Sequence, residues 1–355
     1  MSEAQPFTPL SASTTTRQRD ITIDILRGVA VITMIAANLS AKALAEPHPL
    51  WLRTFGSFAA PLFVLLAGMM IPETHWQKKR NFGHFVLRGL IILAGGVLID
   101  VWFEGIIPFT SMDVLYLIGL SLPLGYLCLR FPASLRWILA LVIFAITPVL
   151  HHYLGYTEYP TEYYLRGVEV EESRDAKVHT SIIQHLFQDG WFPLVPWFGF
   201  VLIGMNLAGL RWRDGKTRSF ATLPVLGFGL MCTAAGIVLG LTIPGRLLTR
   251  GGYSELFYPP TVWYLILACG VIPLLFWGVD SMPRWSFLSP VIVLGQTAFF
   301  ICMLHRGIIA FAISDAHSRN SMAWFLSLYV GLLAVCVACG YGFRWGRKAL
   351  KEMLA

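Results

Sequence analysis

Long apolar segments separated by short polar stretches fill almost the whole chain. A helix needs roughly 20 mostly apolar residues to cross about 30 Å of hydrocarbon, because it rises about 1.5 Å per residue. Segments of about that length lie at 22–41, 55–72, 83–102, 113–129, 135–150, 192–210, 219–243, 260–280, 287–311 and 322–343. The pattern predicts an all-α integral membrane protein with about ten transmembrane helices.

Composition favours a membrane protein over a soluble one. Hydrophobic residues make up 56% of the 355 positions and charged residues 13%, against roughly 25% charged residues in soluble domains. A soluble protein of this size lacks the polar residues to cover so much apolar surface, whereas a bilayer removes that need. The short loops leave no room for a sizeable soluble domain.

Outside the spans, the chain has a short N-terminal segment and one long loop. Residues 1–20 are rich in Ser, Thr and Pro, so we predict a disordered N-terminus followed by one transmembrane domain over 21–355. The longest loop, 151–191, is rich in tyrosine and carries mixed charge. The sequence leaves open whether this loop is functional or a solvated connector with an interfacial helix near 178–188.

The distribution of positive charge predicts the orientation of the chain. Sixteen of the 27 Lys and Arg residues fall on the side of the N-terminus, counting Arg136 at the inner edge of the segment 135–150. Eight fall on the opposite side, and three lie deeper inside the spans. This positive-inside bias predicts that both termini are cytoplasmic and that loop 151–191 is extracytoplasmic. The net charge of +7 does not indicate nucleic-acid binding, because the basic residues form no arm or stripe.

The first apolar segment has some features of a cleavable signal peptide. Arg17 and Arg19 precede it, and the small-residue run 43–45 follows it. Against cleavage, the segment before it is long, and Asp24 and Arg27 interrupt its apolar stretch. We therefore expect an uncleaved first helix.

Charged side chains inside the spans are candidates for function, because each costs several kcal/mol in a bilayer unless it is paired or hydrated. Asp24 and Arg27 stand three residues apart on one helix face, where an ion pair forms readily. Arg88 lies one turn into the third span. Arg27 and Arg88 together can present guanidinium groups to phosphate oxygens. His305 and Arg306 interrupt the ninth span, so we expect them to face a polar cavity.

The remaining chemical candidates are a histidine and the cysteines. His48 lies between Pro47 and Pro49 after the first span, where a histidine is usually solvated. All six cysteines lie in apolar segments, so no disulfide framework is expected. Cys336 and Cys339 form a C-x-x-C pair inside a helix without His or acidic neighbours, which favours packing residues over a metal or redox site. No metal site is predicted.

Four segments of the chain resemble a known group of enzymes. They are IDILRGVAVITMIAANLS…PHPLW, the GSFAAPLFVLLAGMMI helix after it, FPLVPWFGFVLIGMNLAG at 192–209 and LGQTAFFICMLHRGI at 294–308. In this order they are similar to the transmembrane acyltransferase superfamily, and most of all to the heparan-α-glucosaminide N-acetyltransferase family in its bacterial form. The resemblance runs from about Asp20 to the last helix.

The resemblance implies an enzyme that moves an acetyl group from cytosolic acetyl-CoA to an amino sugar or glycan on the extracytoplasmic side, here of a bacterial inner membrane. It places the reactive histidine at His48 and a catalytic asparagine at Asn38. It places Arg27 near the CoA phosphates, and Arg88 matches a basic residue at the start of the third helix. His305 matches the histidine of the LG…LH segment.

The chemistry of acetyl transfer agrees with these positions. The acceptor needs a base with a pKa near neutrality, which histidine supplies. The developing oxyanion needs hydrogen-bond donors, and the Asn38 amide is one. The sequence leaves open whether His48 acts as the base or becomes transiently acetylated.

Three alternatives stay open. Related sugar O-acyltransferases of the cell envelope carry His where Asn38 stands, which weighs against their mechanism. A small-metabolite permease would use Asp24, Arg27, His305 and Arg306 as a relay, but the chain shows no convincing internal repeat. A structural subunit would pair these charges with a partner protein. A homodimer is among the assemblies that the sequence allows.

Overall fold

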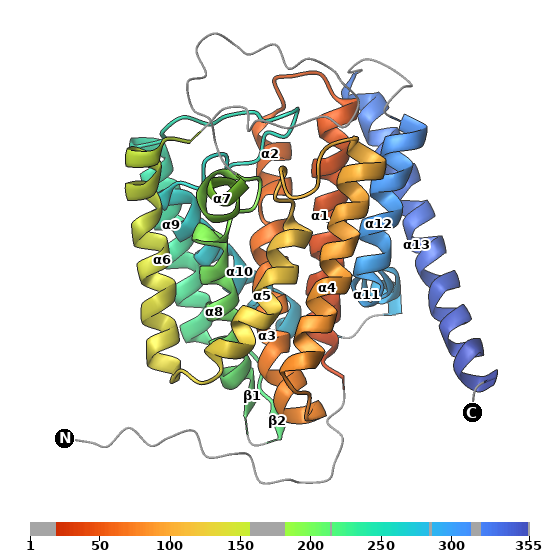
Figure 1. Cartoon of the computed structure of the whole chain (residues 1–355), viewed down its shortest axis with the longest axis horizontal. Coiled ribbons are helices and arrows are strands. Elements are labelled where there is room, and N and C mark those ends of the chain that lie inside the picture. Colours follow the sequence, from red (N-terminus) through yellow and green to blue (C-terminus); the bar gives the residue numbers. More distant parts are fainter. Residues whose placement is uncertain (1–18, 157–181, 214, 284–285, 314–320, 354–355) are drawn as a thin grey trace.

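The computed structural model describes residues 19–156, 182–213, 215–283, 286–313 and 321–353. Figure 1 shows a bundle of helices that run mostly side by side, with one small hairpin at the end where the first helix begins. The helices are α1 (Ile21–Ala43), α2 (Leu50–Ser57), α3 (Ala59–Lys78), α4 (Phe82–Leu98), α5 (Val114–Cys128), α6 (Ala133–Leu154), α7 (Ile182–Gln184), α8 (Leu194–Arg211), α9 (Leu223–Thr242), α10 (Val262–Ser281), α11 (Ser289–Gln296), α12 (Ala298–Ile308) and α13 (Met322–Met353). The hairpin pairs β1 (Trp212–Arg213) with β2 (Lys216–Thr217) in antiparallel register.

The predicted helical membrane fold is confirmed. Among the described residues, eight helices are long and apolar enough to cross a membrane. Each of the ten predicted segments overlaps a helix. The segment 113–129 corresponds to α5, which is shorter than the eight. The segment 287–311 forms two helices that meet at Thr297 with a bend of 79°, as in a broken span or a re-entrant loop.

Both polar segments singled out in the sequence are partly described. Residues 1–18 of the predicted disordered N-terminus lie outside the described residues. Asp20 is the N-cap of α1, and its carboxylate accepts a hydrogen bond from the Thr22 amide, which satisfies one of the free donors at a helix start. In the loop 151–191, α6 continues to Leu154 and the chain is again helical over 182–189. Residues 157–181 lie outside the described part.

Small residues allow the central helices to pack closely. A Cβ atom on Gly68 of α3 would collide with the backbone of Val201 in α8, and one on Gly204 of α8 would collide with the carbonyl oxygen of Leu65. Such small-residue contacts are typical of helix pairs in membranes. By contrast, α9 and α13 bury only a small share of their apolar surface inside the protein, so their free faces are suited to lipid.

We expect Gly68→Val to lower the thermal unfolding temperature of the purified protein. The added side chain forces α3 and α8 apart, and overpacking of this kind costs about 1–3 kcal/mol. Gly278→Val in α10 is the control, because a Cβ there meets nothing within 4 Å. Equal unfolding temperatures for the two variants would show that the α3–α8 contact is not tightly packed.

Candidate active site

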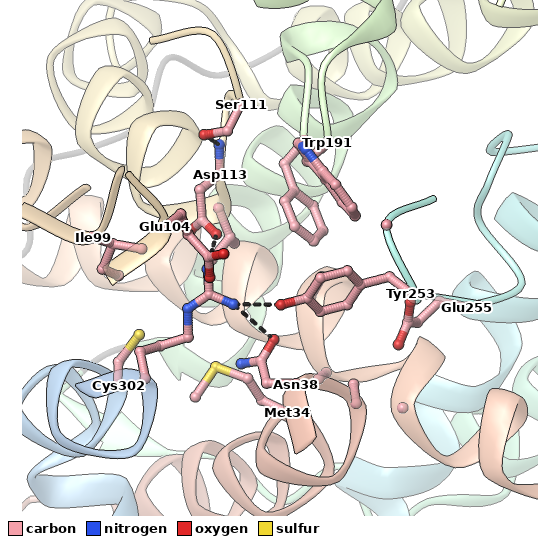
Figure 2. A pocket seen from close by; sticks show the side chains of 18 of the residues that line it. Met34, Asn38, Ile99, Glu104, Ser111, Asp113, Trp191, Tyr253, Glu255 and Cys302 are labelled. Atoms are coloured by element: carbon pink, nitrogen blue, oxygen red, sulfur yellow. Dashed lines mark hydrogen bonds and ion pairs between the residues drawn. The ribbon is translucent and has the colours of Figure 1, made fainter. Parts of the chain in front are cut away.

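Figure 2 shows a cavity of about 250 Å³ that is lined by residues of several helices. Gly56 of α2 is one of them, so the cavity lies toward the end of the bundle where Figure 1 shows α2. Its walls combine aromatic rings with charged side chains, as is usual in ligand sites. The polar and charged residues that line it are Asn38, Lys42, Asp100, Glu104, Ser111, Asp113, Glu255 and Arg306, and the aromatic ones are Phe63, Trp191, Phe192, Tyr253, Phe257 and Tyr258.

Irregular backbone brings the acidic residues to this cavity. The chain after α4 continues as a π-helical segment, Ile99–Glu104, which carries Asp100 and Glu104. Wider turns of this kind are often found at functional sites. Asp113 follows as the N-cap of α5. The stretch before it is held to the segment leading into α8, because the Trp191 amide donates to the Ser111 carbonyl at 3.0 Å.

Arg306 of α12 is the centre of the charged network. Its Nη2 atom lies 2.9 Å from Glu104 and 3.9 Å from Asp113, and its Nη1 atom donates to the Tyr253 hydroxyl at 2.5 Å. Figure 2 shows Glu104, Asp113, Tyr253 and Asn38 converging on this position from four different parts of the chain. The guanidinium group is therefore shared by two carboxylates, as expected for a charge that lies in a membrane protein interior.

Asn38 and His305 form a hydrogen bond whose direction follows from the other contact of the His305 ring. The Nδ1 atom of His305 lies 2.7 Å from the Ile301 carbonyl, so Nδ1 carries the proton and Nε2 is an acceptor. The Asn38 amide nitrogen, 2.8 Å from Nε2, then donates to it. The Asn38 carbonyl oxygen faces Arg306 Nη1 at 3.5 Å. One N–H of Asn38 remains for a ligand in the cavity.

The structure gives a physical reason for two of the segments that carry the family resemblance. The D-x-L-R-G turn of α1 packs directly on α11, since a Cβ on Gly28 would collide with Val291 and one on Gly295 would collide with the backbone of Asp24. Gln296 also donates to the Asp24 carboxylate at 2.9 Å. The LG…LH segment therefore packs along α1. Its first residues contact Asp24, and its histidine, His305, contacts Asn38.

The remaining predicted site residues lie elsewhere. Asp24 is buried, binds Arg19 at 2.6 Å, and lies 3.9 Å from Arg27. Arg27 is close enough to Arg88 for their charges to repel, and Arg88 is exposed on α4. Eleven residues separate Arg27 from Asn38, which is about 16 Å along the helix axis. The arginine pair and the cavity are thus at different depths of the bundle.

His48 is buried beside the cavity but is not among the residues that line it. Its Nδ1 atom lies 2.7 Å from the Ser254 hydroxyl, and its Nε2 atom lies 3.3 Å from the Leu44 carbonyl. The Leu44 contact places the proton on Nε2, so Ser254 donates to Nδ1. Ser254 stands between Tyr253 and Glu255, both of which do line the cavity.

Sequence reasoning missed several of the cavity residues, namely Lys42, Asp100, Glu104, Asp113, Tyr253 and Glu255. A signal for two of them was present, because Asp100 and Glu104 lie at the end of an apolar segment where charge is costly. Tyr253 and Glu255 lie in the loop before α10, and nothing in the local sequence distinguishes them. Within the described residues, no three His, Cys, Asp or Glu side chains gather as metal ligands would.

The fold and the cavity define an integral membrane protein whose helical bundle holds a site lined by charged and aromatic side chains. A family model described as heparan-alpha-glucosaminide N-acetyltransferase, catalytic, matches residues 19–237, which is 219 of the 355 residues. The chain therefore belongs to this family and is a membrane acetyltransferase. The match includes Asn38, His48 and the PWFG helix, whereas the LG…LH segment lies beyond it. No curated protein matches the chain.

Proposed function

We propose that this protein transfers the acetyl group of cytosolic acetyl-CoA to an amino sugar or glycan on the extracytoplasmic side of a bacterial inner membrane. The observation that carries the proposal is the arrangement along α1. An arginine pair lies near its start and a polar cavity lies about 16 Å further on. Acetyl-CoA has the same layout, with phosphates at one end and a thioester at the other end of a long arm.

In this proposal Arg27 and Arg88 hold the CoA phosphates. A guanidinium group makes two parallel hydrogen bonds to phosphate oxygens, which gives both charge and orientation. Two such groups that repel each other in the free protein would be stabilised by a shared anion. The thioester then points along α1 toward the cavity.

The cavity supplies donors for the oxyanion that forms when the acceptor attacks the thioester carbonyl. Asn38 has one amide N–H that is not used by His305. The Tyr253 hydroxyl accepts from Arg306 and so keeps its own proton to donate. Donors held in advance by a buried network need no rearrangement as charge develops, which is why they lower the barrier.

His48 is proposed as the base on the acceptor, or as the group that carries the acetyl transiently. Its imidazole lies behind Ser254 in this structure. Catalysis by His48 therefore requires the segment between α1 and α2 to bring the ring toward the cavity. The Pro residues on both sides keep this segment out of a helix.

We expect Arg27→Ala and Arg88→Ala each to weaken acetyl-CoA binding by about tenfold to a hundredfold. The loss corresponds to one hydrogen bond to a charged group, about 1.5–3 kcal/mol. The Lys variants should recover only part of the affinity, because an ammonium cannot make the paired contact. Titration of the purified protein with acetyl-CoA measures the effect, and Arg344→Ala at the exposed end of α13 is the control.

Unchanged affinity in both Ala variants would contradict the assigned donor site. Release of CoA from acetyl-CoA in the presence of an acceptor separates an acetyltransferase from a permease or a structural subunit, since neither of those predicts it. Mass spectrometry of the acetylated product separates N-acetylation from the O-acetylation that a sugar O-acyltransferase would give.

A further inference from the structure

The cavity contains four carboxylates, and three of them have hydrogen-bond or ion-pair partners among the described side chains. Glu104 and Asp113 share Arg306, and Glu104 also lies 3.5 Å from Lys42. Asp100 accepts hydrogen bonds from the Tyr116 hydroxyl at 2.7 Å and the Ser111 hydroxyl at 2.9 Å. These three are thereby part of the protein's own network.

The fourth carboxylate, that of Glu255, is not fully paired. Its side chain lines the cavity and the residue is only 5% exposed, yet its Oε2 atom has no hydrogen-bond partner among the described residues. Arg53 of α2 is close enough to act on the Glu255 charge, but its guanidinium donates to the backbone carbonyls of Ser254 and Leu248. Figure 2 shows Glu255 well apart from Glu104 and Asp113. A buried carboxylate oxygen without a partner is costly.

The backbone on both sides of Glu255 is held in place. Its neighbour Ser254 is bound by His48 and by Arg53, and the next amide, that of Leu256, donates to the Ser57 hydroxyl at 2.7 Å. Opposite the carboxylate is Gly56, where a Cβ atom would come within 3.4 Å of Oε1. The backbone that carries the carboxylate is therefore held in place, and the side chain lines the cavity.

We propose that Glu255 binds the ammonium group of an amine acceptor and takes one proton from it, so that this residue selects amines over alcohols. The inference rests on the proposed function, which supplies the acetyl donor. An ammonium group would give Glu255 Oε2 the donor and the positive charge that the described side chains do not supply, whereas the other three carboxylates already have partners. A neutral hydroxyl would leave the Glu255 charge uncompensated.

The size and walls of the cavity fit one sugar unit. Pockets for drug-sized ligands have volumes of about 300–1,000 Å³, so a cavity of about 250 Å³ suits a single monosaccharide group. Trp191 packs edge-to-face with Tyr253 and Tyr258 at centroid distances of 4.9 and 5.5 Å, and these rings form an apolar wall near the loop that carries Glu255. The C–H face of a sugar ring can pack on such a wall while its amine reaches the carboxylate.

An ammonium acceptor has two protons to lose before it becomes an amide, and the Glu255 carboxylate takes the first. The freed lone pair forms the N–C bond at the thioester carbonyl as the C–S bond breaks. The second proton passes through the base proposed above, His48, to the departing CoA sulfur. The products are an amide, CoA thiol and a protonated Glu255, which then releases its proton to water.

Charge on Glu255 makes amine binding depend on pH. Burial raises the pKa of Glu255 to about 7, and the groups that act on it are Arg53, Tyr258 and Tyr264. Only the ionised carboxylate binds an ammonium. Affinity for an amine should therefore rise with pH through about 7, until the amine itself loses its proton.

Glucosamine and glucose are the matched probes, because they differ only in an amine or a hydroxyl at one carbon. The purified full-length protein should bind glucosamine about tenfold or more tightly than glucose. Glu255→Gln keeps the shape but removes the charge, so it should abolish this preference, leave glucose binding unchanged and flatten the pH dependence. Glu255→Asp should restore part of the preference. Thermal unfolding of each variant verifies the fold.

A wild-type protein that does not discriminate between the sugars, or a Glu255→Gln variant that keeps the full preference, would overturn the proposal. These outcomes are separate from failure of the proposed function. If the amine preference depends on Glu255 but no CoA is released from acetyl-CoA, the amine site stands and the acetyltransferase reaction does not. If CoA is released and the preference ignores Glu255, only this inference fails.

Discussion

Arg211→Met is expected to destabilise the protein by about 3–5 kcal/mol, the cost of removing one member of a buried ionic group. Arg211 is fully buried at the end of α8 and binds Asp20 at 2.6 Å and Asp280 at 2.7 Å. It also lies over the rings of Phe220 and Phe276. Without it, the carboxylate of Asp20 at the start of α1 and that of Asp280 at the end of α10 would stay buried without the cation that they share. Thermal or denaturant unfolding in detergent measures the change.

Two further variants make this prediction specific. Arg211→Met combined with Asp20→Asn and Asp280→Asn removes all three charges and should recover most of the loss, because no uncompensated ion remains. Arg344→Met, at an exposed position of α13, should leave stability unchanged. A loss below about 1 kcal/mol for Arg211→Met, the range of surface pairs, would mean that water reaches the site.

His48→Ala should lower acetyl transfer by about 10²-fold or more, the scale expected when a general base is removed. Acetyl-CoA affinity should change by no more than a few-fold, because Arg27 lies near the start of α1, with Arg88 of α4 close to it, whereas His48 lies beyond the end of α1. Comparison of the transfer rate with the acetyl-CoA dissociation constant separates a catalytic loss from a binding loss.

The structure supplies a matched control for His48, because this residue also holds the loop before α10. Ser254→Ala breaks the same hydrogen bond but keeps the imidazole, so it should keep most of the activity. His152→Ala, at an exposed position of α6, should be neutral, whereas His185 is buried and is a poor control. If Ser254→Ala loses as much activity as His48→Ala, the histidine positions the loop and does not act on the acceptor.

The apolar periodicity determined most of the fold without any tertiary information. In a bilayer, each span must satisfy its own backbone hydrogen bonds, so length and hydropathy alone specify a helix. This is why each of the ten predicted segments overlaps a helix. The bend at Thr297 was not predictable from hydropathy, because the apolar run continues across it on both sides.

The candidate site was likewise predictable from the sequence only in part. The sequence identified Asp24, Arg27, His305 and Arg306, because ionisable side chains within an apolar segment cost free energy in a membrane unless they are paired or hydrated. Only tertiary structure could show that Arg306 faces Glu104 and Asp113 across the cavity.

What the sequence by itself determined was the helical membrane fold, its approximate spans, the family and the presence of costly polar groups. What only the tertiary structure decided was which of these groups meet. Asn38 and His305 are 267 positions apart, and the Glu255 carboxylate lies in a loop with no local signal. Helix packing determines which residues at such separations come into contact. Whether a buried carboxylate lacks a partner depends on the side chains around it, and these come from distant parts of the chain.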